Sequence, residues 1–71
     1  MTTLDLIAAH FALPSVDPNE TIADLGGDEL TPIELLIEID DDLDVSLPDD
    51  AITLDTTVGE IVEMVERKAV A

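Results

Sequence analysis

The sequence predicts an all-α fold, and two observations support that prediction. Apolar residues recur at the three- and four-residue spacing of a helix face near the start, in the middle and near the end of the chain. No stretch alternates apolar and polar residues in the manner of a half-buried strand. The 71 residues have room for one small core, so we expect a single domain spanning residues 1–71.

The first predicted helix runs from Thr2 or Thr3 to about Leu13. Thr2 and Asp5 have the spacing of a capping box, and Pro14 is expected to end the helix because proline disfavours helical backbone at the residue before it. The apolar stripe of this helix consists of Leu4, Ile7, Ala8 and Phe11.

The last predicted helix runs from about Thr57 to Ala69, and Thr57 with Glu60 offers a second capping box. Its apolar stripe consists of Val58, Ile61, Val62 and Val65. Arg67 and Lys68, the two basic residues of the chain, fall in the last turn, where the helix dipole favours cations. That position explains both residues without a functional role.

Two segments between the helices are predicted to be irregular. Residues 14–27 form a long loop in which Pro18, Gly26 and Gly27 oppose helix formation, and loops of that length in a compact domain are often functional. The expected anchors of this loop to the core are Val16, Ile22 and Leu25. Residues 46–52, whose first residue is a serine and a candidate cap, are predicted to form a short helix or a 3₁₀ turn.

The central predicted helix, from about Pro32 to Leu43, has two faces that differ in chemistry. Its core stripe consists of Leu35, Leu36, Ile39 and Leu43. The opposite side carries Glu34, Glu38 and Asp41, with Ile37 and Ile33 along its edge. Acids in such a row usually form a solvated face. Apolar residues beside a charged rim are instead typical of a partner-docking face, which is the interpretation we favour.

The charge balance narrows the classes of partner. The chain has 18 acidic and 2 basic residues and a net charge of −16, which repels nucleic acid and anionic membranes and favours basic protein partners. Solubility alone is the alternative explanation. Hydrophobic residues make up 46% of the chain, too many for a disordered acidic tail. With no basic leader and no apolar run approaching about 20 residues, we expect a soluble, cytoplasmic monomer.

No sequence feature indicates an enzyme or a metal site. The chain has no cysteine, which excludes a thiolate zinc site and a thiol nucleophile. His10, the one histidine, has no hydroxyl or carboxylate at a spacing that suggests a catalytic pair, so we expect it on the helix surface. A calcium-binding EF-hand loop counted from Asp40 would need Gly at its sixth position and Glu at its twelfth, where Val45 and Ala51 stand.

The run from Ile22 to Val65 resembles the acyl carrier protein family. The resemblance rests on the stretch DLGGDEL leading into IELLIEIDDDLDVSLPDD, followed by TTVGEIVEMV at family-like spacing. It covers most of the chain, and the first helix fits more loosely. The family implies a small four-helix bundle with a short third helix and a long loop between the first two helices.

The resemblance also implies a cofactor and a set of partners. In the family, a serine in Asp-Ser-Leu carries 4′-phosphopantetheine, whose thiol holds an acyl group. The acidic second helix docks on basic patches of synthases, acyltransferases and phosphopantetheinyl transferases. Transferred by position, the partner-binding residues are Asp28, Leu30, Ile33, Glu34, Ile37, Asp40 and Asp41.

The match fails at the attachment position, because Glu29 stands where the family has serine. Phosphopantetheinyl transfer forms a phosphodiester on a hydroxyl oxygen. A glutamate would form a labile mixed anhydride, and its charge would repel the incoming pyrophosphate. We therefore expect no phosphopantetheine on Glu29, and none elsewhere, since Thr31 lies two residues late and Ser15 and Ser46 lie outside the motif.

Thr31 and Pro32 predict a shifted start for the central helix. Proline has no N–H to donate to the carbonyl of Asp28, and it disfavours helical backbone at the residue before it. We expect Thr31 to be the N-cap, with Glu34 completing a capping box. This start would leave Glu29 in the loop or in an irregular turn.

The sequence leaves three functions open. We favour an acyl-carrier-like interaction module that docks carrier-dependent enzymes through its acidic helix and lacks the covalent arm, with Glu29 either mimicking a phosphate charge or simply tolerated. The second is a genuine acyl carrier of fatty-acid or polyketide-type synthesis whose serine is substituted at position 29. The third is an unrelated acidic helical module that binds basic partners.

Overall fold

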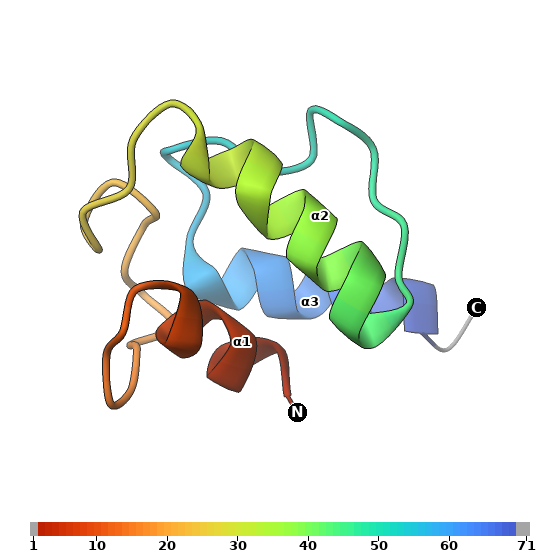
Figure 1. Ribbon diagram of the computed structural model, residues 1–71, viewed down its shortest axis with the longest axis horizontal. Coiled ribbons are helices and arrows are strands. Elements are labelled where there is room, and N and C mark those ends of the chain that lie inside the picture. Colours follow the sequence, from red (N-terminus) through yellow and green to blue (C-terminus); the bar gives the residue numbers. More distant parts are fainter. Residues whose placement is uncertain (1, 70–71) are drawn as a thin grey trace.

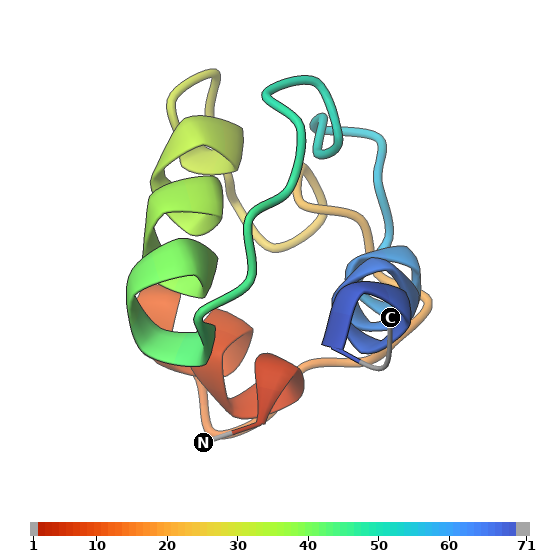
Figure 2. The ribbon, with the colours of Figure 1, turned by 90° about the vertical axis from the view of Figure 1, so that its right-hand side faces the viewer.

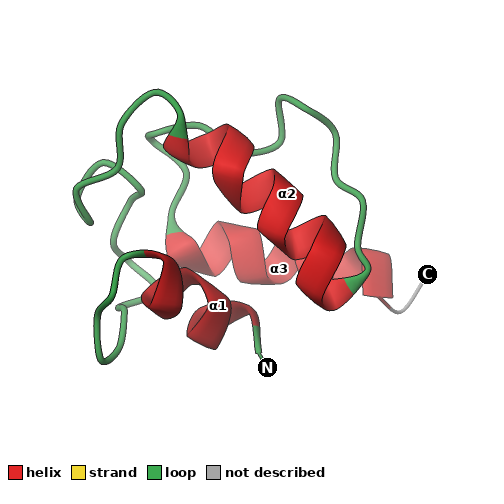
Figure 3. Ribbon diagram, viewed as in Figure 1, coloured by secondary structure: helices red, strands yellow, loops and turns green. Residues whose placement is uncertain are grey.

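The computed structural model describes residues 2–69, and in that part of the chain the regular elements are three helices. They are α1 (Thr3–His10), α2 (Thr31–Leu43) and α3 (Val58–Ala69), joined by two long connections (Figure 1). The β-type pairing within residues 2–69 is limited to an isolated antiparallel bridge between Thr21 and Thr57, and Figure 3 shows no strand. The predicted all-α class is therefore confirmed.

The short third helix that the family resemblance implies is not formed by residues 46–52. This segment holds one hydrogen-bonded turn, in which the Ala51 N–H donates to the Pro48 carbonyl at 3.0 Å. Ser46, the expected cap, instead donates its hydroxyl to the Asp40 carboxylate of α2 (Oγ–Oδ1, 3.3 Å). Without a cap, one isolated turn does not nucleate a helix. A four-helix bundle is thus not confirmed for the described residues.

Helix α1 contacts both other helices. Figure 2 shows α2 and α3 on either side above α1, with the connection 44–57 passing along the opening between them. The largest side chains that fill the space between these elements are aliphatic. The largest fully buried ones are Leu6, Ile7, Ile22, Leu35, Ile39, Ile61 and Val58.

The predicted core faces of α2, α3 and the long loop are confirmed for the most part. Leu35 and Ile39 of α2 are fully buried, whereas Leu36 and Leu43 are half-buried at the edge of the core. In α3 the buried residues are Val58, Ile61 and Val65, with Val62 half-buried. Ile22 anchors the long loop with no exposed surface. The half-buried loop residues that pack against the core are Val16 and Leu25.

The predicted apolar face of α1 is partly wrong. Ile7 and Ala8 are buried as expected and Phe11 is half-buried, but Leu4 is exposed. Leu6, which the predicted stripe omits, is 1% exposed. The reason is that α1 packs against two helices at once, so its buried face is wider than one stripe and is rotated from the predicted position.

Helix α1 also ends earlier than predicted. Its last residue is His10, because Ala12 adopts left-handed backbone with φ 55°. The Leu13 N–H then reaches back to the Ala8 carbonyl at 2.9 Å. This six-to-one hydrogen bond around a left-handed residue is the signature of a Schellman motif. The motif, and not Pro14, therefore ends α1.

Both predicted capping boxes are present. The Asp5 N–H donates to the Thr2 hydroxyl at 3.1 Å, and the Thr2 N–H donates to the Asp5 carboxylate at 3.4 Å. At the start of α3, the Glu60 N–H donates to the Thr57 hydroxyl and the Thr57 N–H donates to the Glu60 carboxylate, each at 3.1 Å. These starts were readable from local sequence because all partners lie within one turn.

Candidate functional site

The turn from Asp28 to Thr31 precedes α2 and presents residue 29. The Asp28 carboxylate accepts hydrogen bonds from the Leu30 N–H at 2.9 Å and from the Thr31 N–H at 3.2 Å. The Thr31 hydroxyl donates to the same carboxylate oxygen at 3.2 Å and accepts the Asp28 N–H at 3.0 Å. Thr31 is 4% exposed, whereas Glu29 is exposed. The turn is therefore held by Asp28 and Thr31, and Glu29 projects from it.

The expected role of Thr31 as N-cap of α2 is wrong. Thr31 is already in the helix, Leu30 is the N-cap, and that cap has no side-chain hydrogen bond. The Glu34 N–H donates to the Leu30 carbonyl at 3.0 Å and not to Thr31, because the Thr31 hydroxyl is occupied by Asp28. The prediction that Glu29 lies in an irregular turn before the helix is confirmed.

The turn is fixed to the core through close backbone packing at Gly27. A Cβ atom at this position would lie 2.6 Å from the Ile22 side chain, 2.8 Å from the Ile22 carbonyl oxygen and 3.3 Å from the Thr31 Cβ. Ile22 is fully buried and its N–H donates to the Thr56 carbonyl at 3.1 Å. Glycine at 27 therefore lets the Asp28–Thr31 turn sit directly on the buried part of the loop.

The hydrogen bonds around Asp28 also change its acid–base behaviour. The bond from the Leu30 N–H is the largest effect and lowers the pKa of the Asp28 carboxyl below its ordinary value of 3.8. Desolvation is the second effect and opposes it, and the bonds from the Thr31 hydroxyl and N–H lower the pKa further. Asp28 is thus held as a carboxylate at the N-terminal end of α2, where the helix dipole favours a negative charge.

The candidate docking residues on α2 and its N-cap are exposed. Leu30, Ile33 and Ile37 expose 58%, 55% and 57% of their surface. The acids at the candidate positions are also exposed; they are Asp28, Glu34, Asp40 and Asp41. The structure therefore brings an aliphatic row and several carboxylates onto one helix and the turn before it.

A shallow groove beside this row includes a residue that sequence reasoning missed. Ile33, Leu36 and Ile37 line the groove from α2, and Asp49 lines it from the connection that follows. Asp49 belongs to the stretch SLPDD, but it lies twelve residues after Ile37 in the sequence. Only the path of the irregular connection brings the two together, so no local pattern could have indicated the pair.

His10 is the second residue whose position the sequence did not indicate. Its side chain is 18% exposed, and its Nδ1 lies 2.5 Å from the Glu38 Oε2 while its Nε2 lies 3.7 Å from the Glu34 Oε1. The expected surface position of His10 is therefore only partly confirmed, because its ring is mostly covered and faces α2. The spacing of Thr3, Ile7 and His10 along one side of α1 could have placed the ring toward the neighbouring helix.

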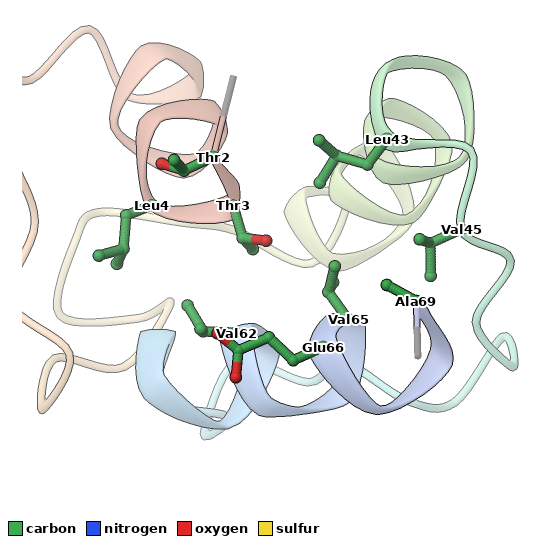
Figure 4. A pocket seen from close by; sticks show the side chains of 9 residues that line it. All are labelled: Thr2, Thr3, Leu4, Leu43, Val45, Val62, Val65, Glu66 and Ala69. Carbon is green, nitrogen blue, oxygen red and sulfur yellow. The ribbon is translucent and has the colours of Figure 1, made fainter. Parts of the chain in front are cut away.

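A separate pocket lies at the other end of α2, between the three helices (Figure 4). It is lined by Thr2, Thr3, Leu4, Leu43, Val45, Val62, Val65, Glu66 and Ala69. Leu43 is the last residue of α2, whereas Glu29 precedes its first, so this pocket is not part of the site around the Asp28–Thr31 turn.

Two other kinds of site receive no support from the described residues. Within residues 2–69, no three His, Asp or Glu side chains are grouped closely enough to hold a metal ion. Among the helices of the described part of the chain, none is long and apolar enough to cross a membrane.

Comparisons with known proteins identify the class of this fold and site. The family described as "Phosphopantetheine attachment site" matches residues 3–65. The acyl carrier protein of Picosynechococcus sp. is 38% identical over 55 residues, which cover 76% of this chain and 68% of that protein. No solved structure gives a significant match.

The matched region contains the candidate turn, the whole of α2 and most of α3. The chain therefore belongs to the acyl carrier protein family, and the alternative of an unrelated acidic module is wrong. Proteins of this family carry 4′-phosphopantetheine and interact with synthases and acyltransferases; they are carriers, so the chain is not an enzyme.

Proposed function

We propose that this protein is an acyl-carrier-like interaction module that docks basic patches of carrier-dependent enzymes through α2 and carries no covalent arm. The observation that supports docking is the row of Leu30, Ile33 and Ile37, each more than half exposed beside exposed carboxylates. Aliphatic anchors within a charged rim match the anatomy of a transient interface. The net charge of −16 would steer basic partners toward this face.

The residues around the turn do not fit a phosphopantetheine arm. Glu29 is the exposed residue at the attachment position, and a carboxylate offers no hydroxyl oxygen for a phosphodiester. The nearest hydroxyl, that of Thr31, is buried and already serves Asp28 as both donor and acceptor. Ser46 lies beyond the C-terminal end of α2, and its hydroxyl donates to the Asp40 carboxylate. These observations support a carrier-type domain that has lost its acceptor.

The second candidate function is a genuine acyl carrier whose serine is replaced at position 29. It is favoured by the intact turn, because Asp28 and Thr31 still hold residue 29 exposed at the start of α2. A serine placed there would present its hydroxyl to solvent. The two candidates differ only in whether the acceptor is absent from the functional protein.

One experiment tests both the docking surface and the missing acceptor. The native chain and its Glu29→Ser variant are incubated with a promiscuous phosphopantetheinyl transferase and coenzyme A, and the intact mass of each is measured. We expect the arm on Glu29→Ser and not on the native chain. Modification of the native chain would overturn the armless function, and an unmodified Glu29→Ser variant would overturn the docking surface.

A pair of additional variants shows whether transfer depends on α2. In the Glu29→Ser background, Ile37→Ala removes an exposed anchor, and we expect kcat/KM for arm transfer to fall about tenfold, the loss typical of an interface anchor worth about 1.4 kcal/mol. The matched control is Val62→Ala, a half-buried aliphatic residue of α3. We expect this control to be modified at the parent rate once both variants are shown to be folded.

A further inference from the structure

His10 joins α1 to the acidic side of α2. It is the last residue of α1, and its ring packs edge-on against Phe11 with centroids 5.0 Å apart and an interplanar angle of 78°. The other side of the ring faces α2, where Nδ1 meets Glu38 and Nε2 meets Glu34. Within residues 2–69 the structure gives His10 no other charged contact.

The two contacts together have a chemical consequence. A neutral imidazole donates a hydrogen bond from one ring nitrogen only, whereas an imidazolium donates from both. With a carboxylate oxygen on each side, only the cation places an N–H toward both partners. Glu34 and Glu38 lie four residues apart on α2, where two negative charges repel each other. A cation between them offsets that repulsion.

The engaged pair is also part of the candidate docking region. Glu34 is one of the proposed partner-binding acids, and its side chain is 54% exposed; Glu38 is 36% exposed. Asp41 on the same side of α2 has no cationic contact within residues 2–69, and neither does Asp40, which accepts only the Ser46 hydroxyl. Of these acids, Glu34 and Glu38 contact His10 of α1, whereas Asp40 and Asp41 have no cationic contact within residues 2–69.

We propose that His10 is a specificity-determining residue that masks Glu34 and Glu38, so that a basic partner is directed to Asp40 and Asp41. This inference rests on the proposed docking function of α2. A partner cation that binds Glu34 must compete with the His10 ring for the same oxygens, whereas one that binds Asp41 does not.

The test measures binding of a defined basic probe to the native chain. The probe is a synthetic amphipathic helical peptide with lysine on one face and leucine on the other, and its Kd is measured for every variant in the same buffer. The His10→Gln variant removes the ring that contacts both glutamates, and His10→Arg replaces it with a permanent cation that has several donors. Amide shifts induced by the peptide show where it binds.

We expect His10→Gln to bind the peptide about two- to fivefold more tightly than the native chain, the size of an exposed ion pair. His10→Arg should bind the peptide more weakly than His10→Gln. The matched control is Arg67→Gln, which removes the cation paired with Glu63 on α3 at 3.8 Å and so changes net charge without touching α2. It should bind the peptide as tightly as the native chain does.

The outcomes separate the mask from the docking surface. Equal affinities of His10→Gln and the native chain, with peptide shifts along α2, would overturn the mask and leave docking intact. A gain in affinity in Arg67→Gln as large as that in His10→Gln would also overturn the mask, because the effect would then come from net charge. Peptide binding away from α2 would overturn the docking surface, and the mask with it.

Discussion

The same four-residue pattern occurs at the start of α2 and of α3, yet it forms different structures. Thr57 and Glu60 close a capping box before α3, whereas Thr31 and Glu34, at identical spacing, do not. The difference is a residue outside the pattern. Asp28 lies three positions before Thr31 and forms hydrogen bonds with the Thr31 hydroxyl. That hydroxyl therefore closes the turn that precedes it and does not accept the Glu34 N–H.

This contrast shows what distinguishes a structural helix start from the candidate functional one. At α3 the cap places a threonine directly before the helix. At α2 the corresponding side-chain hydrogen bonds join Thr31 to Asp28, which precedes the helix. Glu29 and Leu30 lie between these two residues and are exposed. The position that carries the cofactor in the family therefore lies on a turn that is held by hydrogen bonds between Asp28, Leu30 and Thr31.

The largest expected effect tests how the turn is attached to the core. In Gly27→Ala, the new Cβ would meet the rigid Ile22 carbonyl at 2.8 Å, so the Asp28–Thr31 turn must move. We expect a loss of about 1–3 kcal/mol in the free energy of unfolding, measured by urea denaturation, with faster amide exchange at Thr31. Gly26→Ala is the control: it meets no atom within 4 Å, but its φ of 94° costs about 1 kcal/mol without disturbing Thr31.

The next largest effect concerns the stability of the fold at acid pH. Because hydrogen bonds hold the pKa of folded Asp28 below 3.8, its carboxylate stabilises the fold above that value, and this stabilisation is lost as the pH falls through the lower folded pKa. The gap in Tm between the native chain and Asp28→Asn should therefore be constant near neutral pH and narrow below about pH 3.8. Asp55→Asn is the control variant, because it removes an exposed carboxylate that accepts no hydrogen bond within residues 2–69. A constant gap down to acid pH for Asp28→Asn would contradict the role of the turn.

The smallest effect compares the two glutamates directly. Glu60→Ala removes the acceptor of the Thr57 N–H and hydroxyl, and we expect it to cost about 0.5–1 kcal/mol. Glu34→Ala removes no cap, so its free energy of unfolding should stay within about 0.5 kcal/mol of the native value. Urea denaturation measures both, and equal losses would mean that Thr31 and Glu34 also form a capping box in solution.

The sequence was a good guide wherever the deciding partners are close along the chain. The caps at Thr2 and Thr57 and the buried faces of α2 and α3 follow from spacing alone. The exposure of Ile37 follows from the same helical projection. Glu29 was placed correctly in an irregular turn because proline at 32 has only local consequences.

The predictions that failed depend on distant or competing partners. Leu6 is buried because two helices pack on α1, and His10 meets carboxylates 24 and 28 residues away in the sequence. Of the two forms predicted for segment 46–52, a short helix or a 3₁₀ turn, only a single turn is present, because Ser46 bonds to α2 and does not cap a helix. No periodicity within one segment contains this information, because it arises only when the segments pack together.

The exposed row of Leu30, Ile33 and Ile37 has a consequence for the protein at high concentration. Three aliphatic side chains open to water would ordinarily promote self-association. Two copies of this chain, however, present the same acidic helix to each other, so an encounter through the row brings like charges together. The repulsion between the acidic helices therefore opposes self-association through the row. We expect self-association to increase as added salt shortens the range of this repulsion.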